Sequence, residues 1–284
     1  MPELALSVRT LIADGTEQLR NSRVDDPRRQ AMRIWTELDQ RTAAQSVIDG
    51  EHPVNPAEAV RFHDAISRRV RGEPLPHITG RTGFRHLTLA SDARALIPRP
   101  ETEGLVELLL ERAPTGRVAD IGTGSGCIAL SLALEGSYHE VTAVDLSADA
   151  LALARRNRDL AAVRVSLVQA DLCEPLGPDS VDALISNPPY LTADEYSSLD
   201  GSVRDWEPAL ALVSGGDGMA ATLRLLEEGR RVVRPGGWLA LEIDCSRAAA
   251  TAGHASALGW SEVAVHIDLF GRERYLLAQR SNTR

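Results

Sequence analysis

The sequence predicts an α/β protein in which a small N-terminal helical domain precedes a doubly wound, mostly parallel sheet of seven strands with a terminal antiparallel hairpin. Apolar residues in the first quarter of the 284-residue chain recur at helical spacing. From about residue 117, short apolar runs alternate with helical patterns, which is typical of an open parallel sheet. We expect a helical domain over 1–72, a linker with a short hairpin over 73–98, and the sheet domain over 99–284.

The helical domain contains three amphipathic stretches. The apolar positions of the first two are Leu4, Val8, Leu11, Ile12 and Leu19, followed by Ala31, Ile34, Trp35 and Leu38. The third stretch begins at Asn55, a good N-cap before Pro56, and ends at Gly72. In the linker, strand-like pieces around Phe84 and at 87–89 predict a short hairpin. The run from Ile97 to Glu103 then leads into a helix that continues through Leu110.

The sheet domain shows a regular alternation. We expect strands at 117–121, 140–145, 163–169, 181–186 and 238–243, with helices at 126–135, 148–159, 217–233 and 246–257. The last two strands, at 262–268 and 274–279, are joined by a short turn that contains Gly271, which predicts the terminal hairpin. Ligands of doubly wound sheets bind at the carboxyl ends of the strands, so residues that follow strands are the first candidates for a site.

Composition narrows the possible functions. The net charge of −9 makes free nucleic acid a poor partner, because such binding depends on basic residues that meet phosphates. The cysteines, Cys127, Cys173 and Cys245, form no Cys-x-x-Cys pair, which argues against a zinc site or a disulfide framework and fits a reducing cytosol. No signal peptide is apparent after Met1, and no apolar run approaches the roughly 20 residues of a membrane span. We therefore expect a cytoplasmic protein without a metal site.

A glycine loop follows the first expected strand of the sheet and opens a helix. It reads Asp120-Ile121-Gly122-Thr123-Gly124-Ser125-Gly126. Glycines allow a sharp turn and a close approach of the backbone to a ligand. A dinucleotide fingerprint would need a glycine where Cys127 stands, and a P-loop would need a lysine that is absent. The Gly-x-Gly-x-Gly spacing is typical of methyltransferases and predicts that residues 122–126 bind S-adenosylmethionine.

Acidic residues also end the next two strands. The carboxylate of Asp145 can accept hydrogen bonds from both ribose hydroxyls of a nucleoside. Asp171 and Leu172 end the third strand, where an adenine would lie across the strand ends. The alternative is that Asp120, Asp145 and Asp171 are unrelated acids, but their common position at strand ends favours a cofactor site.

The motif Asn187-Pro188-Pro189-Tyr190 closes the fourth strand. The two prolines fix the backbone and remove two N–H donors, so the turn offers acceptors: the Asn187 side-chain oxygen and the Pro188 carbonyl. A primary amide or an exocyclic amine presents two N–H donors in one plane, which these acceptors can hold while positive charge grows on nitrogen. Tyr190 can pack against the plane of the substrate. The alternative is a merely rigid turn, which the flanking Asn187 and Tyr190 make less favoured.

Together these motifs resemble the HemK/PrmC family of protein-glutamine N5-methyltransferases, over about residues 69–276. The matching pieces are Arg69 with Gly72-Glu73-Pro74, Leu96-Ile97-Pro98-Arg99-Pro100-Glu101-Thr102-Glu103, the glycine loop, Asn187-Pro188-Pro189-Tyr190, Glu207-Pro208-Ala209-Leu210, Gly216-Asp217-Gly218, and Asp268 with Gly271-Arg272 and Arg274. The resemblance implies S-adenosylmethionine as cofactor. It implies as substrate the glutamine of the Gly-Gly-Gln motif in class 1 peptide chain release factors, which we expect the helical domain to recognise.

Two departures from the family pattern concern substrate specificity. An aromatic residue is usual where His77 stands, and Leu-Glu-Ile-Gly with a later glutamine is usual where Leu241-Glu242-Ile243-Asp244 and Arg247 stand. Three alternatives stay open. The chain could methylate a glutamine of a ribosomal protein, or N6 of adenine in DNA, which requires base flipping. It could also be a non-catalytic module on the ribosome, against which the intact Asn187 and Tyr190 argue.

Overall fold

The computed structural model describes residues 6–39 and 42–282, and the chain divides into two compact units. The first unit comprises Met1–Gly80 and Gly201–Trp206, and the second comprises Arg81–Asp200 and Glu207–Arg284. The division at Gly80 follows the short helix α5 (Leu75–Thr79), eight residues beyond the position at which the sequence suggested a boundary. Leu4, expected in the first helix, lies outside the described residues.

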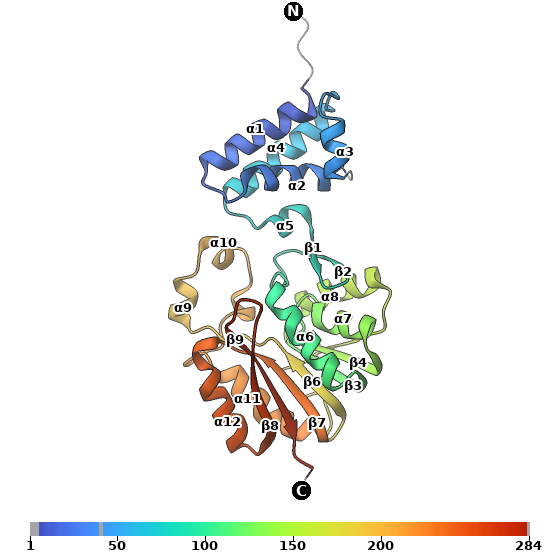
Figure 1. Ribbon diagram of the computed structural model, residues 1–284, viewed down its shortest axis with the longest axis vertical. Helices are drawn as coiled ribbons and strands as arrows, with labels where there is room; N and C mark the ends of the chain where they lie inside the picture. The colour runs from blue at the N-terminus through green and yellow to red at the C-terminus, as the bar shows by residue number, and fades with distance from the viewer. Residues whose placement is uncertain (1–5, 40–41, 283–284) are drawn as a thin grey trace, which may run out of the picture. The chain divides into compact units, whose positions relative to one another are not determined.

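The first unit is helical. Its main helices are α1 (Val8–Asn21), α2 (Pro27–Asp39) and α4 (Pro56–Val70), which contact one another pairwise (Figure 1). The sequence did not predict the short helices α3 (Ala43–Ile48), α5 and α10 (Gly201–Arg204). Asn55 caps α4 as predicted, because its side-chain oxygen accepts a hydrogen bond of 2.9 Å from the Ala57 amide.

One apolar cluster forms the core of this unit. The apolar faces of α1, α2 and α4 converge on Phe62, whose ring meets that of Trp35 edge to face with 6.1 Å between centroids. The fully buried members of the cluster include Leu11, Leu19, Ile34, Phe62 and Ile66. All the residues of this cluster belong to the first unit, so the unit has a core of its own.

The second unit contains a seven-stranded sheet in the order β5-β4-β3-β6-β7-β9-β8. Its strands are β3 (Thr115–Ile121), β4 (Ser137–Asp145), β5 (Ser166–Gln169), β6 (Val181–Ser186), β7 (Val233–Glu242), β8 (Trp260–Ile267) and β9 (Glu273–Arg280). β5, β4, β3, β6 and β7 are parallel, whereas β9 pairs antiparallel with both β7 and β8. The predicted doubly wound sheet with a terminal hairpin is thereby confirmed.

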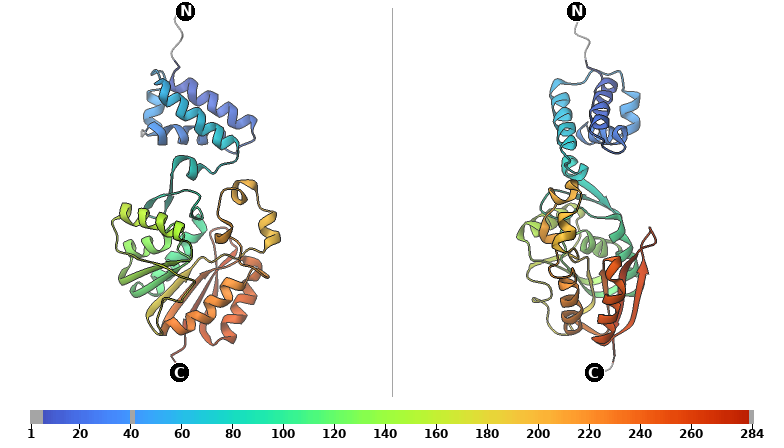
Figure 2. Two further views of the ribbon diagram at one scale, coloured as in Figure 1. Left: turned by 180° about the vertical axis from the view of Figure 1, so that it is seen from behind. Right: turned by 90° about the vertical axis from the view of Figure 1, so that its left-hand side faces the viewer.

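Helices cover both faces of this sheet (Figures 1 and 2). On one face lie α6 (Pro100–Arg112), α7 (Cys127–Glu135) and α8 (Ala148–Ala161). On the other lie α11 (Ala220–Val232) and α12 (Ala248–Ala257). Two separate apolar clusters, one under each helical layer, consist of residues of this unit alone. Such two-sided coverage explains why the strands read as nearly continuous apolar runs.

A small hairpin of β1 (Arg81–Phe84) and β2 (Leu87–Ala90) precedes the sheet. Arg85 in its turn bonds to Glu107 of α6 and to Glu135 of α7. The fully buried amide of Asn157 on α8 donates to the carbonyls of Ala90 (3.2 Å) and Ser125 (2.9 Å). These contacts fix the hairpin against the helices beside the glycine loop.

Three segments differ from the expected pattern, of which the first is β5, expected from residue 163 but beginning at Ser166. β7 begins at Val233 instead of residue 238, and its register against β6 shifts between Val181 and Ala183. Arg234-Pro235-Gly236-Gly237 reads as a turn, but it forms an irregular start of the strand. Between β6 and α11 the chain also forms α9 (Ala193–Ser197) and the 3₁₀ turn η1 (Ala209–Ala211), which were not predicted.

No helix among the described residues is both long enough and apolar enough to cross a membrane.

A substitution in α1 tests how closely the helices of the first unit pack. A Cβ added at Gly15 would lie 2.7 Å from ring atoms of the fully buried Phe62. Gly15→Ala should lower the free energy of unfolding by about 1 kcal/mol, because overpacking outweighs the gain in helix propensity. Denaturant unfolding followed by circular dichroism measures this. Gly253→Ala in α12 is the matched control, since a Cβ there meets nothing within 4 Å and stability should be kept or raised. Equal effects of the two variants would contradict close packing at Gly15.

Candidate active site

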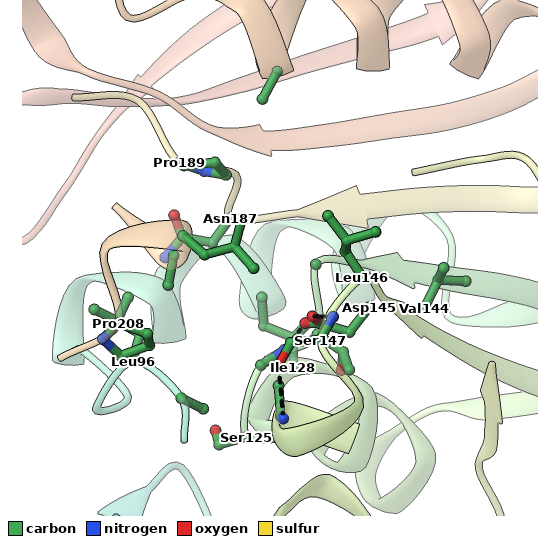
Figure 3. A pocket seen from close by; sticks show the side chains of 18 of the residues that line it. Leu96, Ser125, Ile128, Val144, Asp145, Leu146, Ser147, Asn187, Pro189 and Pro208 are labelled. Carbon is green, nitrogen blue, oxygen red and sulfur yellow. Dashed lines mark hydrogen bonds between the residues drawn. The ribbon is translucent and has the colours of Figure 1, made fainter. Parts of the chain in front are cut away.

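A pocket of about 300 Å³ lies at the carboxyl ends of the parallel strands. The segments that follow β3, β4, β5 and β6 all contribute to it, together with the segment before α6 and the start of α11. Figure 3 shows Asn187 and Pro189 across the pocket from Asp145 and Ser147. The volume and the mostly apolar lining with a few polar groups are typical of a small-molecule site.

The glycine loop forms one wall of this pocket. Gly122, Thr123, Gly124 and Ser125 line it, whereas Gly126 does not and instead caps the start of α7. Gly122 and Gly124 have φ values of +70° and +56°, which favour glycine. A Cβ built at Gly122 would meet no atom within 4 Å, so the loop opens on space here. The amides of Gly122 and Thr123 donate to the Val144 carbonyl at 2.8 and 3.0 Å, which ties the loop to β4.

Asp145, at the end of β4, points its carboxylate toward the glycine loop. One oxygen accepts a hydrogen bond from the Gly124 amide and the other from the Ser147 amide, each at 2.8 Å. Burial raises the pKa of this carboxyl, and the two amide donors oppose the rise. Each carboxylate oxygen keeps a lone pair for a further donor.

The residues after β5 lie further from the glycine loop in the chain but line the same pocket. Asp171 accepts a hydrogen bond of 2.9 Å from Arg224 of α11 and remains partly exposed. Leu172 adopts a φ of +43°, which is unusual for a leucine and turns the chain at the pocket wall. Ala170 completes this part of the lining.

Asp120 stabilises the glycine loop from the protein interior. Its fully buried carboxylate accepts hydrogen bonds from the Thr123 hydroxyl (2.6 Å) and the Ala129 amide (3.1 Å). Burial raises the pKa of Asp120 to about 7, because the charged form loses water. Asp120 does not line the pocket, so its contacts support the turn instead of a ligand.

The Asn187-Pro188-Pro189-Tyr190 turn follows β6 and forms the opposite wall. Asn187 and Pro189 line the pocket, whereas the buried Pro188 and the half-buried Tyr190 do not. The Asn187 amide nitrogen donates to the Thr102 hydroxyl at 3.1 Å. Burial raises the pKa of Tyr190 to about 12, and an Arg274 nitrogen lies 3.5 Å from its hydroxyl. Tyr190 is therefore a neutral phenol in the physiological range.

Glu207 joins two of the motifs that carried the family resemblance. Its buried carboxylate accepts from the Ile97 amide at 2.9 Å and from Arg99 at 2.6 Å. This clamp holds Pro98 and Pro208 in the same wall of the pocket. Sequence reasoning gave Glu207, Thr102 and Glu242 no role of their own, although all three stand in motifs of the family. Asn157 stands in none of those motifs, so no signal pointed to it.

The structure shows where the residues that depart from the family pattern lie and what they contact. His77 is buried on α5 of the first unit. Asp244 caps the 3₁₀ turn η2 (Cys245–Arg247) by accepting from the Ser246 amide. Arg247 donates to the Asp217 carbonyl and to Glu195 of α9, both at 2.7 Å. Arg247 thus connects α9, which follows the Asn-Pro-Pro-Tyr turn, to the Gly216-Asp217-Gly218 loop.

The described residues contain no group of three or more His, Cys, Asp or Glu side chains placed to hold a metal ion. Cys127, Cys173 and Cys245 are all free thiols, and burial raises the pKa of both Cys127 and Cys173 to about 12. Those two cysteines are therefore protonated and act as core side chains.

Comparisons with known proteins show which chains this one resembles. Two family models match: a PrmC N-terminal domain over residues 10–80 and a methyltransferase small domain over residues 100–200. A protein of Deinococcus radiodurans named release factor glutamine methyltransferase is 38% identical over 97% of this chain and 99% of its own length. A protein of the same name from Salmonella typhimurium is 38% identical over 92% of this chain and 94% of its own.

Among solved structures, a methyltransferase from Pyrococcus furiosus superposes with a TM-score of 0.54 at 21% identity. The match covers 69% of this chain and 90% of the other. At that identity the similarity concerns the fold, and it agrees with the sheet topology described above.

Proposed function

We propose that this chain, which belongs to the family of release factor glutamine methyltransferases, transfers a methyl group from S-adenosylmethionine to N5 of the glutamine in the Gly-Gly-Gln motif of class 1 peptide chain release factors. The observation that carries this function is the match to the Deinococcus radiodurans relative along nearly the whole of both chains. The pocket supports it, because a polar amide and a glycine loop face the same cavity from opposite walls.

The residues around the glycine loop suit S-adenosylmethionine. Residues 122–125 offer open backbone, and the lone pairs that remain on Asp145 can accept from ribose hydroxyls. Asp171 and Leu172 would flank the adenine, while Gly126 shapes the turn without lining the pocket. When bound, S-adenosylmethionine supplies a methyl group activated by its sulfonium.

The other wall suits a primary amide. An amide nitrogen is a weak nucleophile, since its lone pair is delocalised into the carbonyl, so the protein must orient it and stabilise the charge that grows on it. Asn187 Oδ1 receives no hydrogen bond from the described residues, and with the Pro188 carbonyl it can accept both N–H groups of the glutamine. These hydrogen bonds strengthen as positive charge develops, which favours the transition state over the ground state. Pro189 and Tyr190 are proposed to support the plane of the amide.

No side-chain base is needed at this site. Once nitrogen carries the methyl group and a positive charge, it is acidic enough to lose its proton to water. The proposed substrate contacts are the Asn187 amide, which lines the pocket, and the carbonyl of the buried Pro188, and such neutral acceptors suit a reaction that depends on orientation and electrostatics. We assign Asn187 and Pro188 to catalysis, with Tyr190 beside them.

The substrate protein needs a larger contact than this pocket offers. A glutamine side chain has little surface, whereas a standard protein interface buries about 800 Å² per partner. We assign recognition of the release factor to the helical domain, residues 1–72. Cytoplasmic location and the absence of a DNA substrate belong to the same proposal, supported by the free thiols and the net charge of −9. A glutamine of a ribosomal protein is the nearest alternative substrate.

Asp145→Ala tests the cofactor assignment. The change should weaken S-adenosylmethionine binding by about 1–3 kcal/mol, because one or two ribose hydroxyls would lose their partner. Calorimetric titration of the purified protein measures the affinity. Asp149→Ala is the matched control, since Asp149 is exposed at the start of α8, does not line the pocket and carries the same charge. Unchanged affinity in Asp145→Ala would place the ribose elsewhere.

Asn187→Ala tests the chemistry and the substrate together. The wild-type chain should methylate a class 1 release factor but neither a ribosomal protein nor DNA, when transfer from labelled cofactor is followed. Asn187→Ala should lower the single-turnover rate on the release factor by about 10²–10³-fold, as expected for the loss of one preorganised polar partner. Its cofactor affinity, measured by calorimetry, should fall much less. A variant as fast as the wild type would refute the mechanism, and labelling of another substrate alone would refute the proposed function.

A shortened chain tests the role of the helical domain. A chain of residues 81–284 keeps both apolar clusters of the second unit and should still bind S-adenosylmethionine. It should lose most of its activity on the intact release factor, by at least about tenfold, which corresponds to about 1.4 kcal/mol of lost recognition. A short peptide that contains Gly-Gly-Gln is the control, because its slow methylation should be equal in both chains. Full activity on the intact factor would exclude the recognition role.

A further inference from the structure

Three side chains from three separate elements meet at the pocket wall, where Asn187 and Thr102 line the pocket and Glu242 lies behind them. Asn187 follows β6, Thr102 lies in the first turn of α6, and Glu242 ends β7, the parallel neighbour of β6. The Asn187 amide nitrogen donates to the Thr102 hydroxyl at 3.1 Å, and that hydroxyl donates to Glu242 Oε2 at 2.7 Å. Thr102 and Glu242 are each only 2% exposed, so water does not compete for these hydrogen bonds.

The protons available in this series of hydrogen bonds determine which way the Asn187 amide faces. A threonine hydroxyl has one proton to donate and two lone pairs with which to accept. An ionised Glu242 can only accept, so the Thr102 proton goes to Glu242. Thr102 must then accept from Asn187, whose only donor is its amide nitrogen. The amide oxygen is left for a ligand, which is the acceptor that a glutamine N–H requires.

A proton on Glu242 would change this arrangement. A protonated carboxyl can donate to Thr102, and the Thr102 hydroxyl can then donate to the Asn187 oxygen. The amide would turn over, so that its nitrogen would face the pocket and meet a glutamine NH₂ donor to donor. The same three residues therefore support two opposite orientations of one amide.

We propose that Thr102 and Glu242 are positioning residues that hold the Asn187 amide with its oxygen toward the substrate, and that protonation of Glu242 reverses this orientation. The inference rests on the proposed function, because it assumes that Asn187 accepts a hydrogen bond from the substrate amide. It adds a pH-sensitive element to the site, formed by a residue that does not touch the substrate.

The surroundings of Glu242 place its titration within the physiological range. Burial raises its pKa to about 7, while the Thr102 hydrogen bond, Arg274 and Arg99 lower it and Glu101 raises it. The ionisable side chains that interact with Glu242 come from every element around it: Arg274 and Tyr275 of β9, Glu101 and Arg99 at the start of α6, Tyr190 after β6, and Cys127 of α7. Glu242 is therefore ionised above about pH 7 and protonated below it.

Because Glu242 is ionised above about pH 7, the rate should increase with pH. The parameter kcat/KM reports ionisation of the free enzyme. It should rise about tenfold as the pH increases through about 7 in the wild type, the lower end of the effect known for loss of a partner that orients a metal-ligating side chain. Glu242→Gln should lose this step, since a glutamine is neutral at every pH and can donate to Thr102 as well as accept from it.

Variants of Thr102 separate orientation from packing. Thr102→Val keeps the shape of the side chain but has no hydroxyl, so it should lower kcat about tenfold and abolish the pH step. Thr102→Ser keeps the hydroxyl and should restore most of the rate together with the step. Calorimetric cofactor affinity and circular dichroism of each variant establish that the fold is intact.

A double-mutant cycle completes the test. In an Asn187→Ala background, Glu242→Gln should cause no further loss, because the residue that it orients is gone. An additive loss in this background, or a pH step that persists in Glu242→Gln and Thr102→Val, would overturn the inference. Those outcomes leave the proposed function intact provided that wild-type protein methylates the release factor. A wild type that does not methylate the release factor would instead refute the proposed function itself.

Discussion

The site depends on one constraint of the sheet: β3 has a parallel partner on each side. It pairs with β4 and β6 so that Ile121 lies opposite both Val144 and Ser186. Three carboxyl ends therefore finish at one level, and the chain can leave them only into the space above the sheet edge. The Ser186 hydroxyl, which donates to the Ile121 carbonyl at 2.6 Å, and the amides that donate to Val144 secure that alignment. The glycine loop, Asp145 and Asn187 face one pocket because of this register.

The same alignment carries a cost that hydrogen bonds offset only in part. It places the carboxyl groups of Asp120, Asp145 and Glu242 at or under the pocket, and burial raises the pKa of all three. Each accepts at least one hydrogen bond from an amide or a hydroxyl, which limits the rise. For Asp120 and Glu242 the folded state favours the protonated form, so stability is lost as the pH rises from the ordinary carboxyl range through about 7. A fold selected for stability alone would have apolar residues there.

Patterns along the chain were sufficient for most of the fold. β6 coincides with its expected range because Asn187-Pro188-Pro189 ends the apolar run abruptly. β7 was harder, since Arg234-Pro235-Gly236-Gly237 looks like a turn, whereas a Cβ at Gly237 would lie 2.6 Å from the Asp182 carbonyl of β6. The glycine is there for close approach of two strands, which depends on tertiary contact. The short helices α3, α5, α9 and α10 have too few turns for a periodic pattern.

Local sequence patterns likewise predict only some of the site residues. Residues that act through their position after a strand, such as Asp145 and Asn187, could be found from spacing, and the structure brings them to one pocket. Residues that support them could not. Thr102 and Glu242 are 140 residues apart, and Glu207 reaches Ile97 across 110 residues, so no local pattern links these partners. Motif membership marked the residues without indicating what they contact.

The support behind Asn187 explains why a neutral amide can serve where a charge is needed. A carboxylate at the wall would attract the growing positive charge, but it would also bind the neutral substrate and the sulfonium strongly in the ground state, which does not accelerate the reaction. In this protein the negative charge of Glu242 lies two hydrogen bonds behind the pocket, relayed by Thr102. Hydrogen bonds in such a chain polarise one another in a low-dielectric interior, so an ionised Glu242 makes the Asn187 oxygen a better acceptor. The full charge stays away from the ligands, and its effect reaches the nitrogen mainly as that nitrogen becomes positive.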